Sequence, residues 1–188
     1  MKIFGVAGQL RNGKDEIADF LALKLNYKRA AFASNVKRIF CETFGVDLEF
    51  IEKWKTINEP PPGFDMPVRQ ALQFIGDGFR KIKNDIWVDL IFRHNPSESV
   101  ISDCRYVNEL KEIKKNGGWN ILVYRPGFLN DDPNESESQI KPFVLNFIQK
   151  GIEGKVKDEN ENFSLIDYFI INDGTLEDLH KKIDSFIK

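Results

Sequence analysis

The sequence predicts an α/β fold in which a parallel sheet carries helices on both of its faces. Short apolar runs with the length of buried strands recur along the chain, and amphipathic helical patterns separate them. Strands joined through helices pair in parallel, and such a sheet is covered on both sides. A glycine-rich turn also joins the first apolar run to the first helical pattern. Ligands of such sheets bind beyond the carboxyl ends of the strands, which is where this turn would lie.

The first half of the chain is expected to be mostly helical. A strand, a helix and a short second strand are expected at residues 2–7, 16–25 and 28–32. Four helical patterns follow, with apolar side chains at steps of three and four. Prolines at residues 60–62 end the second pattern, Pro67 can open the third, and Gly76 is the expected end of the third. The four patterns cover residues 35–44, 48–57, 67–76 and 85–92.

The second half of the chain contains three further strand candidates. Strands are expected at residues 100–101, 119–124 and 167–171, and helices at residues 108–116 and 175–187. Residues 127–165 separate the last two strands and are polar and turn-rich around an apolar run at residues 143–148. This segment belongs to a region, residues 125–166, that is either a lid closing over a reacting phosphate or a surface excursion.

Length and composition limit the classes of protein that fit. The 188 residues suit one domain with a full core, so we expect a single domain over residues 1–188. A net charge of −2 and a pI of about 5.8 argue against long nucleic acid as a partner without excluding it. Cys41 and Cys104 are too few for a disulfide framework, and no apolar run is long enough for a membrane span. We expect a soluble, cytoplasmic protein with no membrane partner.

The most informative motif is the run Gly8-x-x-x-x-Gly13-Lys14, which lies between the first strand and the first helix. A loop of this kind wraps phosphates with its backbone N–H groups, and the following helix N-terminus favours negative charge. Lys14 would reach the outer phosphates as a point charge. The motif therefore predicts a site for a nucleoside triphosphate.

The residue after Lys14 departs from the usual pattern. A serine or threonine hydroxyl normally helps to hold Mg²⁺ at this position, and here it is Asp15. An aspartate can bind Mg²⁺ directly or through water. The alternative is an acidic residue in the first helical turn that complements the helix dipole. Both interpretations of Asp15 stay open from the sequence.

Polar side chains also follow the later strands. Asp103 could hold Mg²⁺ and Arg105 could bind a phosphate, or Asp103 could simply cap the next helix. Arg125 leaves the strongest strand and enters a turn. Residues 172–174 read Asn-Asp-Gly, which could face a base or form an ordinary turn. His94 and His180 are assigned no role, because no motif joins them to an acid or a nucleophile.

Seven segments in the same order resemble the deoxynucleoside monophosphate kinases of bacteriophages, which are P-loop kinases. The first includes the unusual Gly-Lys-Asp ending, whereas Asn35 replaces a proline of the family pattern and Asn134 replaces a histidine. These two departures leave the substrate within the group open. The matching segments are residues 8–15, 32–37, 68–76 with 85–88, 103–105, 125–127, 132–137 and 171–175.

The resemblance implies a P-loop kinase three-layer fold with a lid insertion, and an acceptor-binding helical region at residues 35–98. It implies transfer of the γ-phosphate of ATP, with Mg²⁺, to a deoxynucleoside monophosphate, giving the diphosphate and ADP. Lys14, Asp103 and Arg125 would be catalytic, and Asp15 and Asp103 would bind the metal. ATP would be bound by Gly8, Arg11, Asn12, Gly13, Lys14, Asp15, Glu16, Asn172, Asp173 and Gly174. The acceptor would be bound by Lys37, Arg69, Gln73 and Arg105.

Several alternatives stay open. P-loop kinases of similar pattern act on dephospho-CoA, on phosphomevalonate or on 5-hydroxymethyluracil within DNA. A nucleotide-binding regulator without transfer activity is a further alternative, although Lys14, Asp103, Arg105 and Arg125 speak against it. The location would be the host cytoplasm if a phage encodes the chain. The oligomeric state stays open, with a homodimer among the possibilities.

Overall fold

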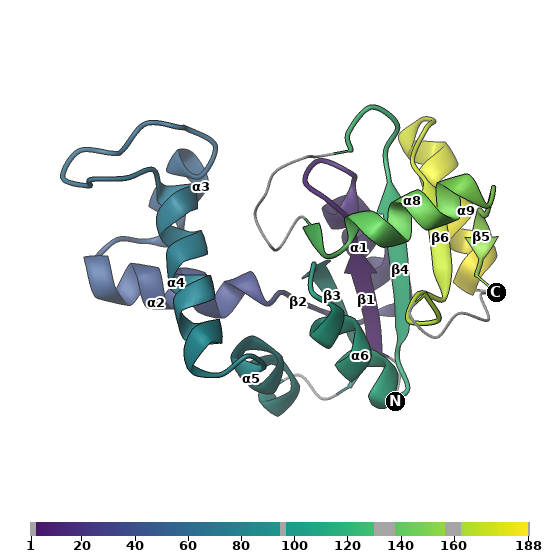
Figure 1. Cartoon of the computed structure of the whole chain (residues 1–188), viewed down its shortest axis with the longest axis horizontal. Coiled ribbons are helices and arrows are strands. Elements are labelled where there is room, and N and C mark those ends of the chain that lie inside the picture. Colours follow the sequence, from purple (N-terminus) through teal and green to yellow (C-terminus); the bar gives the residue numbers. More distant parts are fainter. Residues whose placement is uncertain (1–2, 95–96, 130–137, 157–162, 188) are drawn as a thin grey trace. The chain divides into compact units, whose positions relative to one another are not determined.

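The computed structural model describes residues 3–94, 97–129, 138–156 and 163–187. The chain divides into two compact units, which are described separately below. Residues 1–31 and 94–188 form the sheet unit, and residues 32–93 form the helical unit. Figure 1 labels the helices and strands of both. The expectation of a single domain over residues 1–188 stays a prediction.

Within the described residues, the sheet unit contains six strands in the order β2-β3-β1-β4-β6-β5. The first five of these pair in parallel, as predicted, but β5 pairs antiparallel with β6, so the sheet is mixed. The predicted fold class is confirmed, and β5 is an additional edge strand that was not predicted, because a two-residue strand in a polar stretch has no periodicity to detect. The strands are β1 (Ile3–Ala7), β2 (Lys28–Ala30), β3 (Ser99–Cys104), β4 (Trp119–Tyr124), β5 (Gly154–Lys155) and β6 (Tyr168–Ile171).

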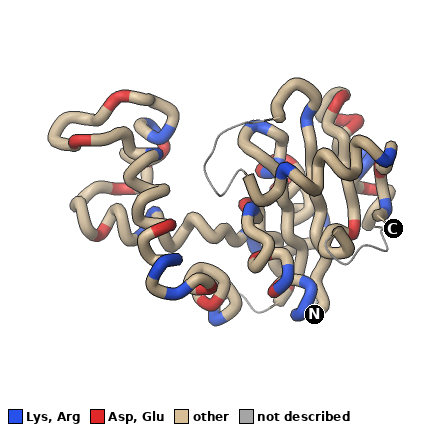
Figure 2. Tube along the Cα trace, viewed as in Figure 1, with Lys and Arg blue, Asp and Glu red and all other residues tan. Residues whose placement is uncertain are grey.

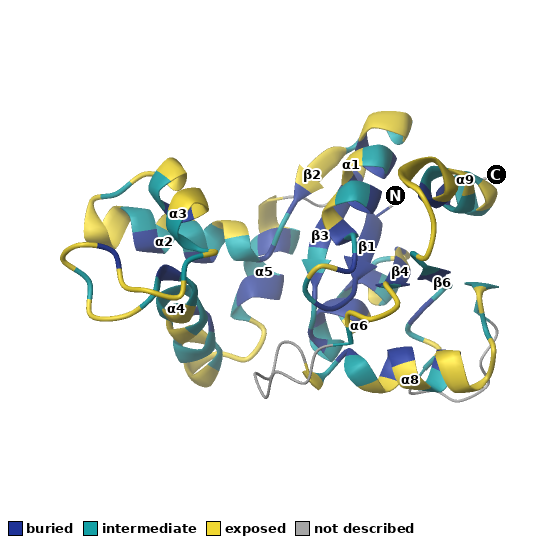
Figure 3. Ribbon diagram, turned by 90° about the horizontal axis from the view of Figure 1, so that it is seen from above, coloured by how far each residue is buried: buried dark blue, intermediate teal, exposed yellow. Residues whose placement is uncertain are grey.

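Helices cover both faces of this sheet, which gives the predicted three layers. One face carries α1 (Lys14–Leu25) and α9 (Leu176–Ile187), and the other carries α6 (Val107–Lys115) and α8 (Lys141–Gln149) (Figure 3). The strand side chains beneath α1 and α9 are apolar and buried, and so are the helix side chains that meet them. The buried residues of this layer include Val6, Ile17, Leu21, Val100, Ile121, Ile170, Leu179 and Ile183.

The strand register brings four strand ends to the same edge of the sheet. Ala7, the last residue of β1, pairs with Cys104 at the end of β3 and with Leu122 near the end of β4. Tyr124 at the end of β4 pairs with Ile171 at the end of β6. The turns that follow these strands therefore leave the sheet side by side. The chain runs from β1 to β2 on one side of β1, and later crosses from β3 to β4 on its other side. Sheets of this kind bind ligands at the strand where the connections change side.

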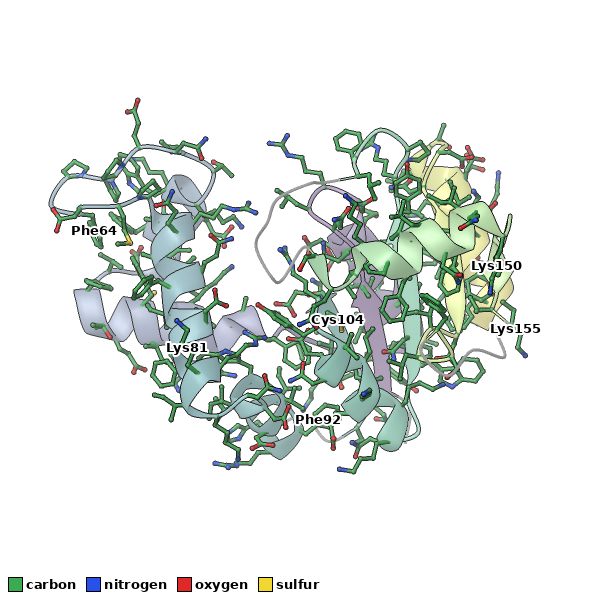
Figure 4. All side chains as sticks on the ribbon, viewed as in Figure 1. Phe64, Lys81, Phe92, Cys104, Lys150 and Lys155 are labelled. Carbon is green, nitrogen blue, oxygen red and sulfur yellow. The ribbon has the colours of Figure 1, made fainter. Side chains whose placement is uncertain are left out.

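The helical unit consists, in its described residues, of α2 (Ala33–Phe44), α3 (Leu48–Trp54), α4 (Val68–Ile82) and most of α5 (Ile86–His94). Phe40 lies in its core, and the ring of Phe64, labelled in Figure 4, stacks on Phe40 at 5.8 Å between centroids. The expected end of the third pattern at Gly76 is wrong, because α4 continues to Ile82. A helical glycine costs about 1 kcal/mol, which does not by itself end a helix, and beyond Gly76 the ring of Phe79 packs on buried Trp87.

The described part of residues 127–165 is packed on the sheet. The apolar run at residues 143–148 lies in α8, where Phe147 contacts Phe169 of β6 with ring centroids 5.3 Å apart. Phe143 packs edge-on against Phe163 at 5.4 Å. The acidic element at residues 132–137 lies outside the described residues, and the lid stays a prediction. No helix in the described ranges is long and apolar enough to cross a bilayer.

Gly5 in β1 has no room for a Cβ, and we expect Gly5→Ala to destabilise the fold. An added Cβ would lie 2.5 Å from Cδ1 of Ile113 and 2.6 Å from Oδ1 of Asn120. Such overpacking should lower the free energy of unfolding by about 1–3 kcal/mol, measured by urea titration. Gly78→Ala in α4 is the matched control. It meets nothing within 4 Å and has a helical backbone, so it should raise stability by up to about 1 kcal/mol. Equal effects of the two substitutions would contradict this packing.

Candidate active site

The glycine-rich loop between β1 and α1 has the backbone that its sequence predicts. Gly13 adopts a φ of 99°, and a Cβ at this position would lie 2.6 Å from Nδ2 of Asn172. A Cβ on Gly8 would lie 2.6 Å from the carbonyl oxygen of Val123 in β4. Arg11 has a φ of 64°, a left-handed conformation that residues other than glycine adopt at a cost. The loop is therefore held tightly curled against the ends of β4 and β6.

Lys14 begins α1 and turns its side chain back into this loop. The residue is only 7% exposed, and its Nζ donates a hydrogen bond to the carbonyl oxygen of Gln9 at 2.7 Å. The positive charge is thereby held inside the curve of the loop, together with the positive end of the α1 dipole. An anion seated on the loop would meet both.

A pocket of about 390 Å³ opens beside the loop at the carboxyl edge of the sheet. Eight of its ten lining residues are among those that the sequence singled out, and the other two are Leu10 and Ser102. The lining carries four cationic side chains and three carboxylates, a balance that suits an anion bound together with a cation. The residues are Leu10, Arg11, Gly13, Lys14, Asp15, Glu16, Ser102, Asp103, Arg105 and Arg125.

Asp103 and Arg105 enter this pocket from the end of β3. The alternative in which Asp103 caps the next helix is wrong, because Tyr106 holds the N-cap position of α6. The cap is completed by Glu109, a carboxylate that is 1% exposed. Its Oε2 accepts hydrogen bonds from the backbone N–H groups of Arg105 at 2.7 Å and Tyr106 at 3.0 Å. Sequence reasoning missed Glu109, although a glutamate in the first turn of a helix is a known capping signal.

Asp15 is both exposed and paired. Its carboxylate lines the pocket, and Oδ1 lies 3.2 Å from Nη2 of Arg29, which comes from β2. Arg29 also pairs with Asp19 one helical turn further along α1. Arg29 therefore offsets the negative charge that Asp15 brings close to the glycine-rich loop. The side chain of Asp15 is 85% exposed, so the carboxylate stays accessible.

Glu16 lines the pocket and contacts His180, to which no role was assigned from the sequence. Nε2 of His180 lies 3.0 Å from Oε1 of Glu16, and the imidazole stacks on Phe20 with ring centroids 4.0 Å apart. No sequence motif joins His180 to an acid, yet the structure pairs it with Glu16. The two residues are 164 positions apart, so only the packing of α9 on α1 brings them together.

The turn at residues 172–174 contacts the glycine-rich loop. Nδ2 of Asn172 donates to the backbone carbonyl of Asn12 at 3.1 Å. The Asp173 carboxylate accepts a hydrogen bond from Lys182 at 2.9 Å, which holds the pKa of Asp173 below its usual value. Gly174 precedes α9, whose first turn is capped by Thr175 and Asp178. None of residues 172–174 is among the residues that line the pocket, so their contact with a base stays a prediction.

Three of the four predicted acceptor residues belong to the helical unit. Lys37 in α2 pairs with Glu52 of α3 at 2.7 Å, and this hydrogen bond holds the pKa of Glu52 below its usual value. Arg69 and Gln73 lie four residues apart on α4, and both are half-buried. This spacing places the two side chains on one face of the helix. Their role in acceptor binding stays a prediction.

Ser102 and Leu10 are pocket residues that sequence reasoning missed. Ser102 is buried, and its hydroxyl lies 3.5 Å from the carbonyl oxygen of Ala30 in β2. Ser102 directly precedes Asp103 at a strand end, and this position could have predicted it as a site residue. Behind it, Cys104 (Figure 4) is fully buried, and this burial raises the pKa of its thiol well above the ordinary value. The thiol is therefore neutral and packs as an apolar group.

Comparisons with known proteins address the fold and the family. No family model matches the chain. A protein of Acanthamoeba polyphaga mimivirus named "Putative deoxynucleotide monophosphate kinase" is 27% identical, covering 100% of this chain and 96% of that protein. The relative is viral, and a bacteriophage origin of this chain stays a prediction.

Two solved structures align over nearly the whole chain. Shikimate kinase from Aquifex aeolicus aligns with 100% of this chain and 96% of that chain, with a TM-score of 0.51 and 16% identity. Shikimate kinase from Acinetobacter baumannii, in complex with shikimate, aligns with 99% and 92% of the two chains, with a TM-score of 0.50 and 15% identity. The alignments include the mostly parallel sheet and its helical layers. The chain has the fold of the P-loop kinases.

Proposed function

We propose that the chain is a kinase that transfers the γ-phosphate of ATP to a deoxynucleoside monophosphate, giving a deoxynucleoside diphosphate and ADP. The observation that carries the proposal is the pocket that joins the phosphate loop to Asp103, Arg105 and Arg125. The fold supports phosphoryl transfer. The mimivirus relative, similar along the whole chain, supports a nucleotide as the acceptor.

In this proposal the phosphate loop binds the donor. The N–H groups of the loop and the N-terminus of α1 bind the phosphates of ATP, and Lys14 neutralises charge on the outer ones. Arg125 contacts the transferring group and stabilises the charge that it carries in the transition state. Phosphoryl transfer depends mainly on position and charge, and the protein needs no nucleophile of its own.

Mg²⁺ fits the proposed site. Mg²⁺ bound with nucleotides uses one or two carboxylates together with phosphate oxygens and water, so a dedicated protein cage is not required. Asp103 faces the pocket that Lys14 also lines, and Asp15 is a second accessible carboxylate. When bound, the metal would offset the negative charge of the phosphates. We propose Asp103 as a ligand, because it lines the pocket together with Lys14 and Arg125.

Four side chains are the proposed contacts of the acceptor. We propose that Lys37, Arg69 and Arg105 bind the monophosphate and that Gln73 reads the base edge, where an amide offers both a donor and an acceptor. Charge of both signs is interspersed along the chain (Figure 2), and the net charge of −2 favours a small acceptor over a polynucleotide.

A panel of acceptors tests the proposal. Protein and γ-labelled ATP with Mg²⁺ are incubated in turn with each of the four common deoxynucleoside monophosphates, dephospho-CoA, phosphomevalonate and DNA that contains 5-hydroxymethyluracil. We expect label in at least one deoxynucleoside diphosphate and in none of the other products. If only one of the other acceptors becomes labelled, that acceptor is the substrate and the proposed one is wrong. Tight ATP binding without any transfer would favour a nucleotide-binding regulator.

We expect Arg69→Ala to weaken binding of the monophosphate and to spare ATP. A charge-assisted bidentate contact is worth about 1.5–3 kcal/mol, so the KM for the acceptor should rise by roughly ten- to a hundred-fold. Steady-state kinetics with each substrate varied in turn measures this. Gln73→Ala should instead change the ranking among the four bases.

The control for this prediction is Gln70→Ala, an exposed residue one position further along α4 and on a different face. It should change neither KM by more than about twofold, since surface substitutions cost little. If Arg69→Ala weakens binding of ATP and leaves the KM of every monophosphate unchanged, the assignment of the acceptor site to α4 is wrong.

A further inference from the structure

Asn12 has an unusual place in the phosphate loop. The residue is only 1% exposed, and its side-chain amide faces the turn that follows β4. Oδ1 accepts a hydrogen bond from the backbone N–H of Arg125 at 2.5 Å. Nδ2 donates to the carbonyl oxygen of Phe128 at 3.4 Å and to that of Leu10 at 3.2 Å. One amide thus connects two loops that are 113 residues apart in the sequence.

The turn that Asn12 contacts also holds the guanidinium of Arg125. The N–H of Phe128 donates to the carbonyl oxygen of Arg125 at 3.0 Å, which closes residues 125–128 into a turn. The guanidinium carbon of Arg125 lies 5.0 Å from the centroid of the Phe128 ring. Asn12 therefore binds both ends of the turn, since it contacts the N–H of its first residue and the carbonyl of its last.

The backbone of Asn12 is fixed from the other side by β6. Asn172 donates to the carbonyl oxygen of Asn12 at 3.1 Å, and the same amide leaves no room for a Cβ on Gly13. The peptide and the side chain of Asn12 are therefore held by the ends of two different strands. This arrangement explains why a polar residue is buried at this point of the loop, because each of its polar groups has a partner.

We propose that Asn12 is the positioning residue of Arg125, so that the phosphate loop and this arginine form one rigid assembly. The inference rests on the proposed function, in which Arg125 contacts the transferring phosphoryl group. Arg125 is exposed and begins a surface turn, so without a brace its guanidinium would sample many positions. The Asn12 amide fixes the backbone from which the guanidinium extends, and the Phe128 ring limits its direction.

The chemistry of an amide suits this task. The N–H of Arg125 requires an acceptor, and the carbonyl oxygens of Phe128 and Leu10 require a donor. An amide side chain carries both. Aspartate would keep the acceptor but would place a second carboxylate oxygen against the two carbonyls. Alanine would lose both contacts. The two substitutions therefore separate the bond to Arg125 from the bonds to Phe128 and Leu10.

A double-mutant cycle on kcat tests the inference. We expect Asn12→Ala to lower kcat by about ten- to a hundred-fold, the cost of a displaced catalytic group. In the Arg125→Ala background the same substitution should lower kcat by less than about twofold, because the group that Asn12 positions is already gone. If kcat of the double variant falls by the product of the two single-variant losses, the inference is overturned. A wild-type protein that transfers phosphate to no acceptor would instead overturn the proposed function.

Asn120→Ala is the matched control for a merely structural role. Asn120 is a fully buried asparagine in β4, and its Nδ2 also donates to two carbonyl oxygens, those of Leu110 and Leu165, each at 2.9 Å. Its loss should lower the free energy of unfolding and leave kcat of the folded protein unchanged. If Asn120→Ala lowers kcat as much as Asn12→Ala does, loss of packing explains both and positioning is overturned.

Amide hydrogen exchange at Arg125, followed by heteronuclear NMR, gives a readout that needs no activity. The exchange rate of this N–H should rise by at least about tenfold in Asn12→Ala, since its acceptor is removed. In Asn12→Asp the N–H should stay protected, because Oδ1 remains. An unchanged rate in Asn12→Ala would show that Asn12 does not hold this turn and would overturn the inference.

Discussion

Replacing Lys14 with alanine should abolish phosphoryl transfer while leaving the fold intact. Lys14 begins α1 and holds its charge in the curve of the phosphate loop through the carbonyl of Gln9. The core beneath α1 is built from other residues, Ile17 and Leu21 among them, so the loss concerns charge rather than packing. Removal of one charge clamp in phosphoryl transfer costs roughly three to five orders of magnitude in rate. Formation of ADP in the presence of a deoxynucleoside monophosphate measures the effect.

Lys24→Ala is the matched control for Lys14→Ala. Lys24 lies in the same helix, carries the same charge and pairs on the surface with Asp184 of α9. Such a pair contributes at most about 1 kcal/mol to stability and touches no pocket residue. The control should transfer phosphate at the wild-type rate. Turnover by Lys14→Ala that matches this control would show that the loop is not a phosphate site.

Arg125→Ala should lower kcat far more than it weakens ATP binding. We place the contact of Arg125 with the phosphoryl group mainly in the transition state, and an interaction of that kind lowers kcat when it is removed. An arginine in this role is worth roughly three to five orders of magnitude in rate. Steady-state kinetics gives kcat, and titration with ATP alone gives the binding constant.

Arg38→Ala is the control for this second variant. Its guanidinium pairs with Glu42 on the exposed side of α2, so its removal should leave both constants near their wild-type values. A rise in the KM for ATP at constant kcat in Arg125→Ala would make Arg125 a ground-state contact. That result would contradict the role given to the turn at residues 125–128.

The sequence predicted the parts of the site that depend on local pattern. The phosphate loop follows from glycine spacing and from the flanking strand and helix, and the pocket residues Asp103, Arg105 and Arg125 follow from the rule that strand ends carry ligands. β4 begins and ends at the predicted residues, because a mostly apolar run between Gly118 and Pro126 allows little choice. The end of α4 was missed, because a glycine does not by itself end a helix, and Phe79 packs on Trp87 beyond it.

Contacts between distant segments could not be predicted from local pattern. Asn12 was expected to bind ATP, and the structure shows its amide joined to residues 125 and 128. The partners of Asp15 and Lys37 are Arg29 and Glu52, which lie 14 and 15 positions away. A motif gives the type of a side chain, but the neighbour that it meets depends on how the helices pack. The same holds for the pair of His180 and Glu16.

Phosphorus NMR of the wild-type protein with ATP, Mg²⁺ and an equal mixture of the four common deoxynucleoside monophosphates tests the central claim most directly. The proposed function predicts that the γ-phosphate signal of ATP falls while the signals of ADP and of a deoxynucleoside diphosphate grow at equal rates. The signal of inorganic phosphate should stay at its starting level. Unchanged ATP, or ADP that forms together with inorganic phosphate and no deoxynucleoside diphosphate, would contradict the claim.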